Sequence, residues 1–149
     1  MINVKISDIV LLLFPIILGI GLVSIIVRKE TICGKKSSLQ PPGWVFATVW
    51  PILYLLMGVS IVLYWRQIER RPSYKLYLFI VATFLLQAWW IIFNKICAPK
   101  AAFITLVALA ILFLIIALSF YKTSKIATYC MIPLIAWLSF ASYLTYSTI

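Results

Sequence analysis

Uncharged, mostly apolar segments alternate with short polar segments along the whole 149-residue chain. Each apolar segment reaches the roughly 20 residues that a helix needs to cross a ~30 Å hydrocarbon core. Spanning strands would be about half as long and would alternate in polarity. The pattern therefore predicts an all-α integral membrane protein with one domain over residues 1–149. Its five transmembrane helices are expected at about residues 6–27, 42–65, 74–94, 99–121 and 124–147.

Composition strengthens this prediction and narrows the choice of partners. Hydrophobic residues make up 65% of the chain, against roughly 45–50% in soluble domains. The net charge of +10 is carried by the polar segments between helices, where basic side chains meet lipid headgroups. We therefore expect membrane lipid, and not nucleic acid, as the partner of the basic residues.

The first polar segment, residues 28–40, is the longest of the connections. Loops between packed helices usually have about 2–8 residues. The loop could be a simple tether. Its extra length favours one of two other roles, a lid that covers a pocket or a contact with lipid headgroups. Pro41 and Pro42 then end the loop and set the entry angle of the second helix.

The spanning segments lack the side chains on which most membrane chemistry depends. The chain contains no histidine. No Asp, Glu, Lys or Arg occurs in residues 9–27, 39–65, 76–94, 101–121 and 126–149. Proton relays and ion-coupled transport normally need an intramembrane ionisable group, so these functions are disfavoured. General acid–base catalysis and metal sites lack their usual residues as well. We expect no metal and no obligatory cofactor, and binding by shape, stacking and neutral hydrogen bonds.

Aromatic residues form 15% of the chain and occur both at helix ends and inside helices. Anchoring at the membrane interface explains those at helix ends, such as Trp44. It does not explain the interior tryptophans, whose indole N–H groups need acceptors when buried. Packing and a flat aromatic pocket both account for them. The candidate ligand-binding residues are Trp44, Trp50, Tyr54, Gln87, Trp89, Phe93, Trp137 and Phe140.

Three sequence blocks resemble the TspO/MBR family, which includes translocator proteins and tryptophan-rich sensory proteins. Residues 41–58 are similar to the family pattern PPxWVFxxVWxxLYxxMG of its second helix. Trp89 and Phe93 are similar to the WxxxFF end of its third helix. Residues 133–141 are similar to PYLAWLAFAT in its fifth helix. The resemblance extends over nearly the whole chain.

The resemblance implies a single five-helix bundle around a ligand pocket that the loop between helices 1 and 2 closes. The family binds tetrapyrroles such as protoporphyrin IX, and its mitochondrial members bind cholesterol. The family's pocket tryptophans match Trp50 and Trp137. In some bacterial members of the family, those pocket tryptophans are implicated in the degradation of porphyrin in light. The family implies a bacterial or outer mitochondrial membrane and a homodimer.

Three functions follow as hypotheses. The first is a receptor or carrier for tetrapyrroles, with protoporphyrin IX or haem as the stacked ligand. The second is a light- and oxygen-dependent porphyrin-degrading enzyme, for which Trp50 and Trp137 are the candidate catalytic residues. The third is a sterol- or lipid-binding scaffold. The sterol-recognition motif of the family is only partly present, as Leu144 and Tyr146 without a following basic residue.

Overall fold

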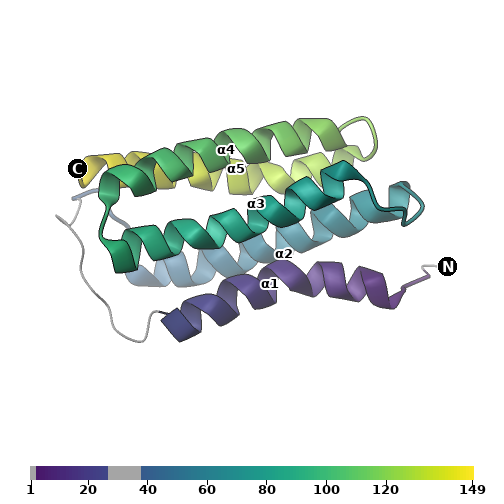
Figure 1. Ribbon diagram of the computed structural model, residues 1–149, viewed down its shortest axis with the longest axis horizontal. Coiled ribbons are helices and arrows are strands. Elements are labelled where there is room, and N and C mark those ends of the chain that lie inside the picture. The colour runs from purple at the N-terminus through teal and green to yellow at the C-terminus, as the bar shows by residue number, and fades with distance from the viewer. Residues whose placement is uncertain (1–2, 27–37) are drawn as a thin grey trace.

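A computed structural model describes residues 3–26 and 38–149, and the regular secondary structure in these ranges is all helical. The helices run back and forth as an elongated bundle (Figure 1). The prediction that residues 28–40 form a lid falls largely on residues 27–37, which lie outside the described part. The helices are α1 (Ile6–Ile26), α2 (Gly43–Gln67), α3 (Tyr74–Ile91), the π-helical turn η1 (Ile92–Ile96), α4 (Pro99–Phe120) and α5 (Lys125–Ser147).

The bundle has the lengths and composition of a membrane protein. Helices α2, α3 with η1, α4 and α5 are each long and apolar enough to span a bilayer, and α1 contributes a shorter apolar stretch, Ile6–Leu22. Large apolar side chains such as Ile104, Ile111 and Leu118 of α4 face outward, as expected where lipid is the solvent. The predicted five-helix, multi-pass membrane bundle is confirmed.

Two glycines allow α1 to approach α2 closely. A Cβ atom on Gly58 of α2 would collide with the backbone carbonyl of Leu12. A Cβ on Gly19 of α1 would collide with the ring of Tyr54. Because the hydrophobic effect does not drive helix association inside lipid, close backbone contact of this kind supplies much of the packing energy. The glycines therefore seat α1 against the other helices.

Buried hydroxyl groups connect the remaining helices. Ser60 of α2 donates to the carbonyl of Ala127 at 2.7 Å, and Thr128 of α5 donates to the carbonyl of Ala117 in α4, also at 2.7 Å. At the same end of the bundle, Tyr64 stacks on Phe120 with ring centroids 4.1 Å apart. In this half of the bundle Trp65 also packs against the core, whereas the buried Trp50 and Trp89 lie in the other half.

Candidate functional site

A cavity of about 340 Å³ lies at the end of the bundle where α2 begins and α5 ends. Four of the predicted site residues line it: Trp50 from α2, Trp89 and Phe93 from α3 and η1, and Trp137 from α5. The cavity is thus enclosed by aromatic rings from three helices. The remaining lining residues are Gln40, Gly43, Phe46, Trp90, Asn94, Ala141, Leu144, Thr145 and Thr148.

The rings around the cavity are arranged as a row with one wall set across it. Trp50 lies 5.6 Å from Tyr54 and 6.0 Å from Trp89, with interplanar angles of 29° and 30°. Trp89 continues the row to Phe93 at 6.0 Å and 23°. Trp137 stands nearly perpendicular to Trp50, at 6.3 Å and 88°. These separations lie within the range of favourable aromatic pairs.

Three buried polar atoms in this region have no hydrogen-bond partner among the described residues. They are the indole nitrogens of Trp89 and Trp137 and the side-chain oxygen of Gln87. A buried polar group without a partner costs about 1–3 kcal/mol. The two indoles are donors, so a ligand that carries acceptor oxygens would satisfy them.

Tyr54, at one end of the row, and Gln87 do not line the cavity. The Gln87 amide nitrogen lies 3.4 Å from the Tyr54 hydroxyl, and both side chains are buried. Tyr54 lines a second cavity of about 240 Å³ on the side of α1. The two cavities share Phe46, Trp50 and Trp90 as lining residues. These three aromatic residues therefore lie between the two cavities.

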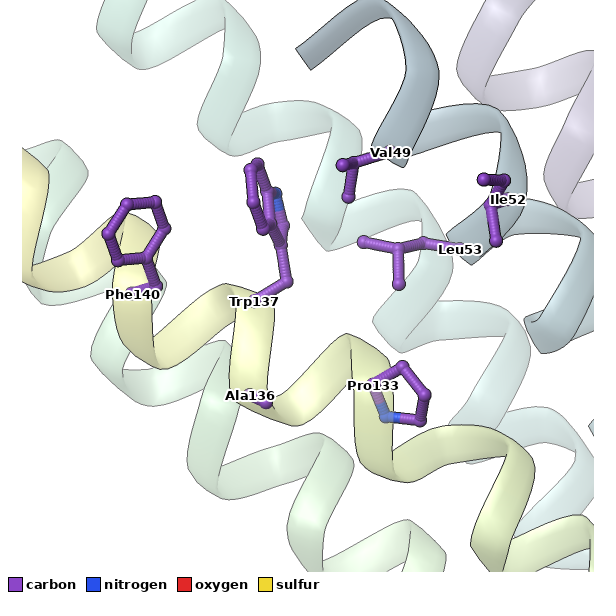
Figure 2. Close-up of a pocket in the computed structure, with 7 residues that line it drawn as sticks. All are labelled: Val49, Ile52, Leu53, Pro133, Ala136, Trp137 and Phe140. Carbon is purple, nitrogen blue, oxygen red and sulfur yellow. The ribbon is translucent and has the colours of Figure 1, made fainter. Parts of the chain in front are cut away.

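Phe140 and Trp44, the other two predicted residues, lie outside the aromatic cavity. Phe140 borders an apolar groove of about 420 Å³ between α2 and α5, together with Val49, Leu53 and Pro133 (Figure 2). Trp137 borders both this groove and the cavity. Trp44 is 69% exposed and lines none of these spaces, which fits the interfacial role also considered for it.

Several lining residues were not among the predicted ones. Phe46 packs edge-on against Trp137 with centroids 5.6 Å apart. Its position one helical turn before Trp50 was a usable signal, because residues four apart share a helix face. Thr145 lies two turns beyond Trp137 on α5, and Thr148 caps the end of that helix three turns beyond Trp137. The same rule would have found them.

The cavity lining offers stacking surface and neutral polar groups. None of the residues that line it within the described part is acidic, basic, cysteine or histidine. In the same part of the chain, no group of three or more histidine, cysteine or acidic residues is placed to hold a metal ion. The site is thus suited to hold a flat, largely apolar molecule by shape and to orient it by hydrogen bonds.

A multi-pass helical bundle with four long apolar helices and a shorter apolar first helix defines an integral membrane protein. The chain belongs to the TspO/MBR family, whose sequence profile matches residues 11–149. It is 32% identical to the tryptophan-rich protein TspO of Chlorobaculum tepidum over 116 residues, which cover 75% of this chain and 72% of that protein.

Relatives are found in archaea and animals as well. The tryptophan-rich protein TspO of Archaeoglobus fulgidus is 29% identical over 118 residues, or 76% of this chain and 73% of its own. The human translocator protein is 29% identical over 115 residues, or 75% of this chain and 68% of its own. The family resemblance predicted from the motifs is confirmed.

Proposed function

We propose that this protein is a membrane-embedded binding protein, a receptor or carrier, for tetrapyrroles such as protoporphyrin IX. The observation that carries the proposal is the convergence of Trp50, Trp89 and Trp137, from three different helices, on one cavity. A planar conjugated macrocycle is the ligand class that gains most from flat aromatic walls.

The size of the site supports a ligand of this class. The cavity of about 340 Å³ lies at the lower end of the ~300–1,000 Å³ usual for small-molecule sites. The second cavity adds about 240 Å³ directly behind Trp50. A rotation of the Trp50 side chain would join the two, and the joined space would hold a larger ring system.

The unpartnered donors support a ligand with acidic groups. Protoporphyrin carries two propionate carboxylates, which are acceptors when ionised. The indole nitrogens of Trp89 and Trp137, without partners among the described residues, are the groups suited to bind such oxygens. Hydrogen bonds to a charged group contribute about 1.5–3 kcal/mol each.

The test is a titration of the purified protein with protoporphyrin IX, followed by quenching of tryptophan fluorescence. We expect saturable quenching and weaker binding by the Trp50→Ala and Trp137→Ala variants. Loss of one stacked ring should cost on the order of 1 kcal/mol, or about fivefold in affinity. Trp44→Ala is the matched control, because the same truncation at an exposed ring outside the cavity should leave affinity unchanged.

The helical content and thermal stability of each variant must match those of the parent for the comparison to hold. If Trp50→Ala and Trp137→Ala bind as tightly as the parent while folded, the aromatic cavity is not the tetrapyrrole site. If Trp44→Ala weakens binding as much as they do, the quenching reports on the bundle surface.

A further inference from the structure

A charged cluster lies at the end of the bundle opposite the aromatic cavity. Figure 1 shows the N-terminus at the same end as the connection between α2 and α3. There the carboxylate of Asp8, in the first turn of α1, accepts hydrogen bonds from two arginines. Arg66 bonds to it through Nε and Nη2, each at 3.1 Å, and Arg70 through Nε at 3.2 Å and Nη2 at 3.0 Å.

The backbone of the turn is shaped to bring Arg70 to this carboxylate. Glu69 and Arg70 have φ angles of 58° and 57°, in the left-handed region that residues with a side chain rarely adopt. The Arg70 amide bonds back to the carbonyl of Trp65 at 2.9 Å and closes the end of α2. Two consecutive strained residues of this kind point to a functional requirement more than to a simple connection.

The cluster holds more positive charge than its carboxylate neutralises. Asp8 is only 3% exposed, and the side chains of Arg66 and Arg70 are 29% and 23% exposed. One arginine would balance Asp8, so the second leaves a net positive charge on the accessible side. Both guanidinium groups bond to Asp8 through Nε and Nη2, and Nη2 of each also donates to the Asn3 carbonyl, at 3.4 Å for Arg66 and 2.9 Å for Arg70. Within the described residues, neither Nη1 has a partner.

The position of the cluster along the bundle indicates which kind of anion can reach it. Trp65 donates to Ser7 at 3.2 Å beside the cluster, and at the same end of the bundle Tyr74 and Tyr121 are 74% and 41% exposed. Tryptophan and tyrosine near the ends of spanning helices mark the level of the lipid headgroups. An anion at this depth is a lipid phosphate, and paired guanidiniums match the oxygens of a phosphate better than single ammonium groups do.

We propose that Arg66 and Arg70, held in place by buried Asp8, form a binding site for the phosphate of an anionic phospholipid. The site is independent of the tetrapyrrole cavity and lies at the opposite end of α2. Asp8 is a positioning residue in this site, because it fixes the two guanidiniums and does not face the lipid.

The test is native mass spectrometry of the full-length protein in detergent, titrated with phosphatidylglycerol and, separately, with phosphatidylcholine. We expect the first phosphatidylglycerol to bind at least about tenfold more tightly than phosphatidylcholine. Arg66→Gln and Arg70→Gln should each weaken it about fivefold or more. Arg71→Gln is the control: it makes the same charge change in the same turn, but its side chain is 82% exposed and pairs with Glu69.

Asp8→Asn separates a preorganised site from general attraction to positive charge. This variant makes the protein more positive by one charge, so simple electrostatics predicts tighter binding of phosphatidylglycerol. The proposal predicts weaker binding, because the guanidiniums lose the group that orients them. Tighter binding by Asp8→Asn, or an equal loss in Arg71→Gln and Arg66→Gln, would overturn the proposal.

Two further measurements address misfolding of the Asp8→Asn variant and the possibility that the ligand is a soluble phosphate. If Asp8→Asn lacks the helicity of the parent, Arg70→Lys replaces it: this variant keeps the charge, cannot bond Asp8 through two nitrogens, and should bind several-fold more weakly. Parent-like binding by folded Arg70→Lys refutes the site. Glycerol 3-phosphate should not compete at millimolar concentration, and effective competition would refute the assignment to lipid.

Discussion

Trp137 takes part in two surfaces at once. It lines the aromatic cavity, and it also lines the apolar groove between α2 and α5 that Figure 2 shows. The groove is lined by apolar side chains such as Val49 and Pro133. A single indole thus separates the cavity from the lipid-facing side of the bundle, so substitutions of Trp137 affect both the walls and the closure of the site.

The role of Trp137 in photochemistry is testable because phenylalanine stacks but is much harder to oxidise. None of the described lining residues of the cavity is an acid or a base, so the indoles are its oxidisable groups. We expect illumination of the protoporphyrin complex in air to bleach the pigment at similar rates in the parent and in Trp137→Phe. Chromatography of the products, with Trp44→Phe as control, checks this. A single product from the parent that Trp137→Phe fails to form would show catalysis by the indole.

Haem and metal-free protoporphyrin should bind almost equally well. Strong axial ligation of iron needs a side chain such as histidine, cysteine, methionine or tyrosine. The chain has no histidine, and the lining of the 340 Å³ cavity contains none of the other three. The second cavity is lined by Tyr54, whose hydroxyl is already paired with the Gln87 amide at 3.4 Å. We expect dissociation constants within about threefold of each other by fluorescence quenching. A hundredfold preference for haem, with a spectrum of strong axial ligation, would contradict a site based on stacking.

At the scale of elements, the contact between α1 and α2 depends on the absence of side chains. Gly58 faces the Leu12 backbone, which cannot move aside as the end of a flexible side chain can. Gly21, in the same α1 helix as Gly19, has open space around it. Gly58 and Gly21 both lie inside helices but differ in packing, so substitutions at these two positions form a matched pair.

Gly58→Ala should destabilise the bundle, and Gly21→Ala should not. Overpacking typically costs about 1–3 kcal/mol, and alanine regains up to about 1 kcal/mol of helix propensity. We therefore expect a net loss of about 1–2 kcal/mol at Gly58 and no loss at Gly21. Thermal unfolding in detergent, followed by circular dichroism, measures both. Equal stabilities would mean that α1 shifts freely to accommodate a methyl group.

The end of α3 is the element that the sequence pattern did not predict. The helix turns into the π-helical segment Ile92–Ile96 and stops at Cys97, which has a φ of 56°. The π turn is only five residues long, which is too short for a hydrophobic period to reveal it. The turn contains Phe93 and Asn94, so it sets the positions of two residues that line the cavity. Such turns are frequent at functional sites.

At the scale of the molecule, the positions of charges sufficed to predict five membrane helices. This succeeded because lipid forces uncharged segments into complete helices. The candidate site was only partly accessible to the same reasoning. Helix periodicity and the family motifs indicated Trp50, Trp89 and Trp137, but which side of each ring meets a cavity depends on how the helices are rotated, and no local pattern encodes that.

Contacts between distant segments were beyond the reach of sequence reasoning. Asp8, Arg66 and Arg70 were assigned to separate polar segments, and nothing local links a residue to partners 58 and 62 positions away. The second cavity could not be predicted for the same reason, because its walls come from α1, α2 and Trp90, which are far apart in the sequence.

The separation between Asp8 and its arginines also sets an order of events during synthesis. A ribosome adding roughly 5–20 residues per second needs about 3–12 seconds to extend the chain from Asp8 to Arg66. Throughout that interval the carboxylate lacks both cations, and it must stay in water at the membrane surface. Asp8 therefore keeps the start of α1 from sliding into the bilayer until the end of α2 emerges. The ion pairs that hold the start of α1 can therefore form only after the end of α2 has been made.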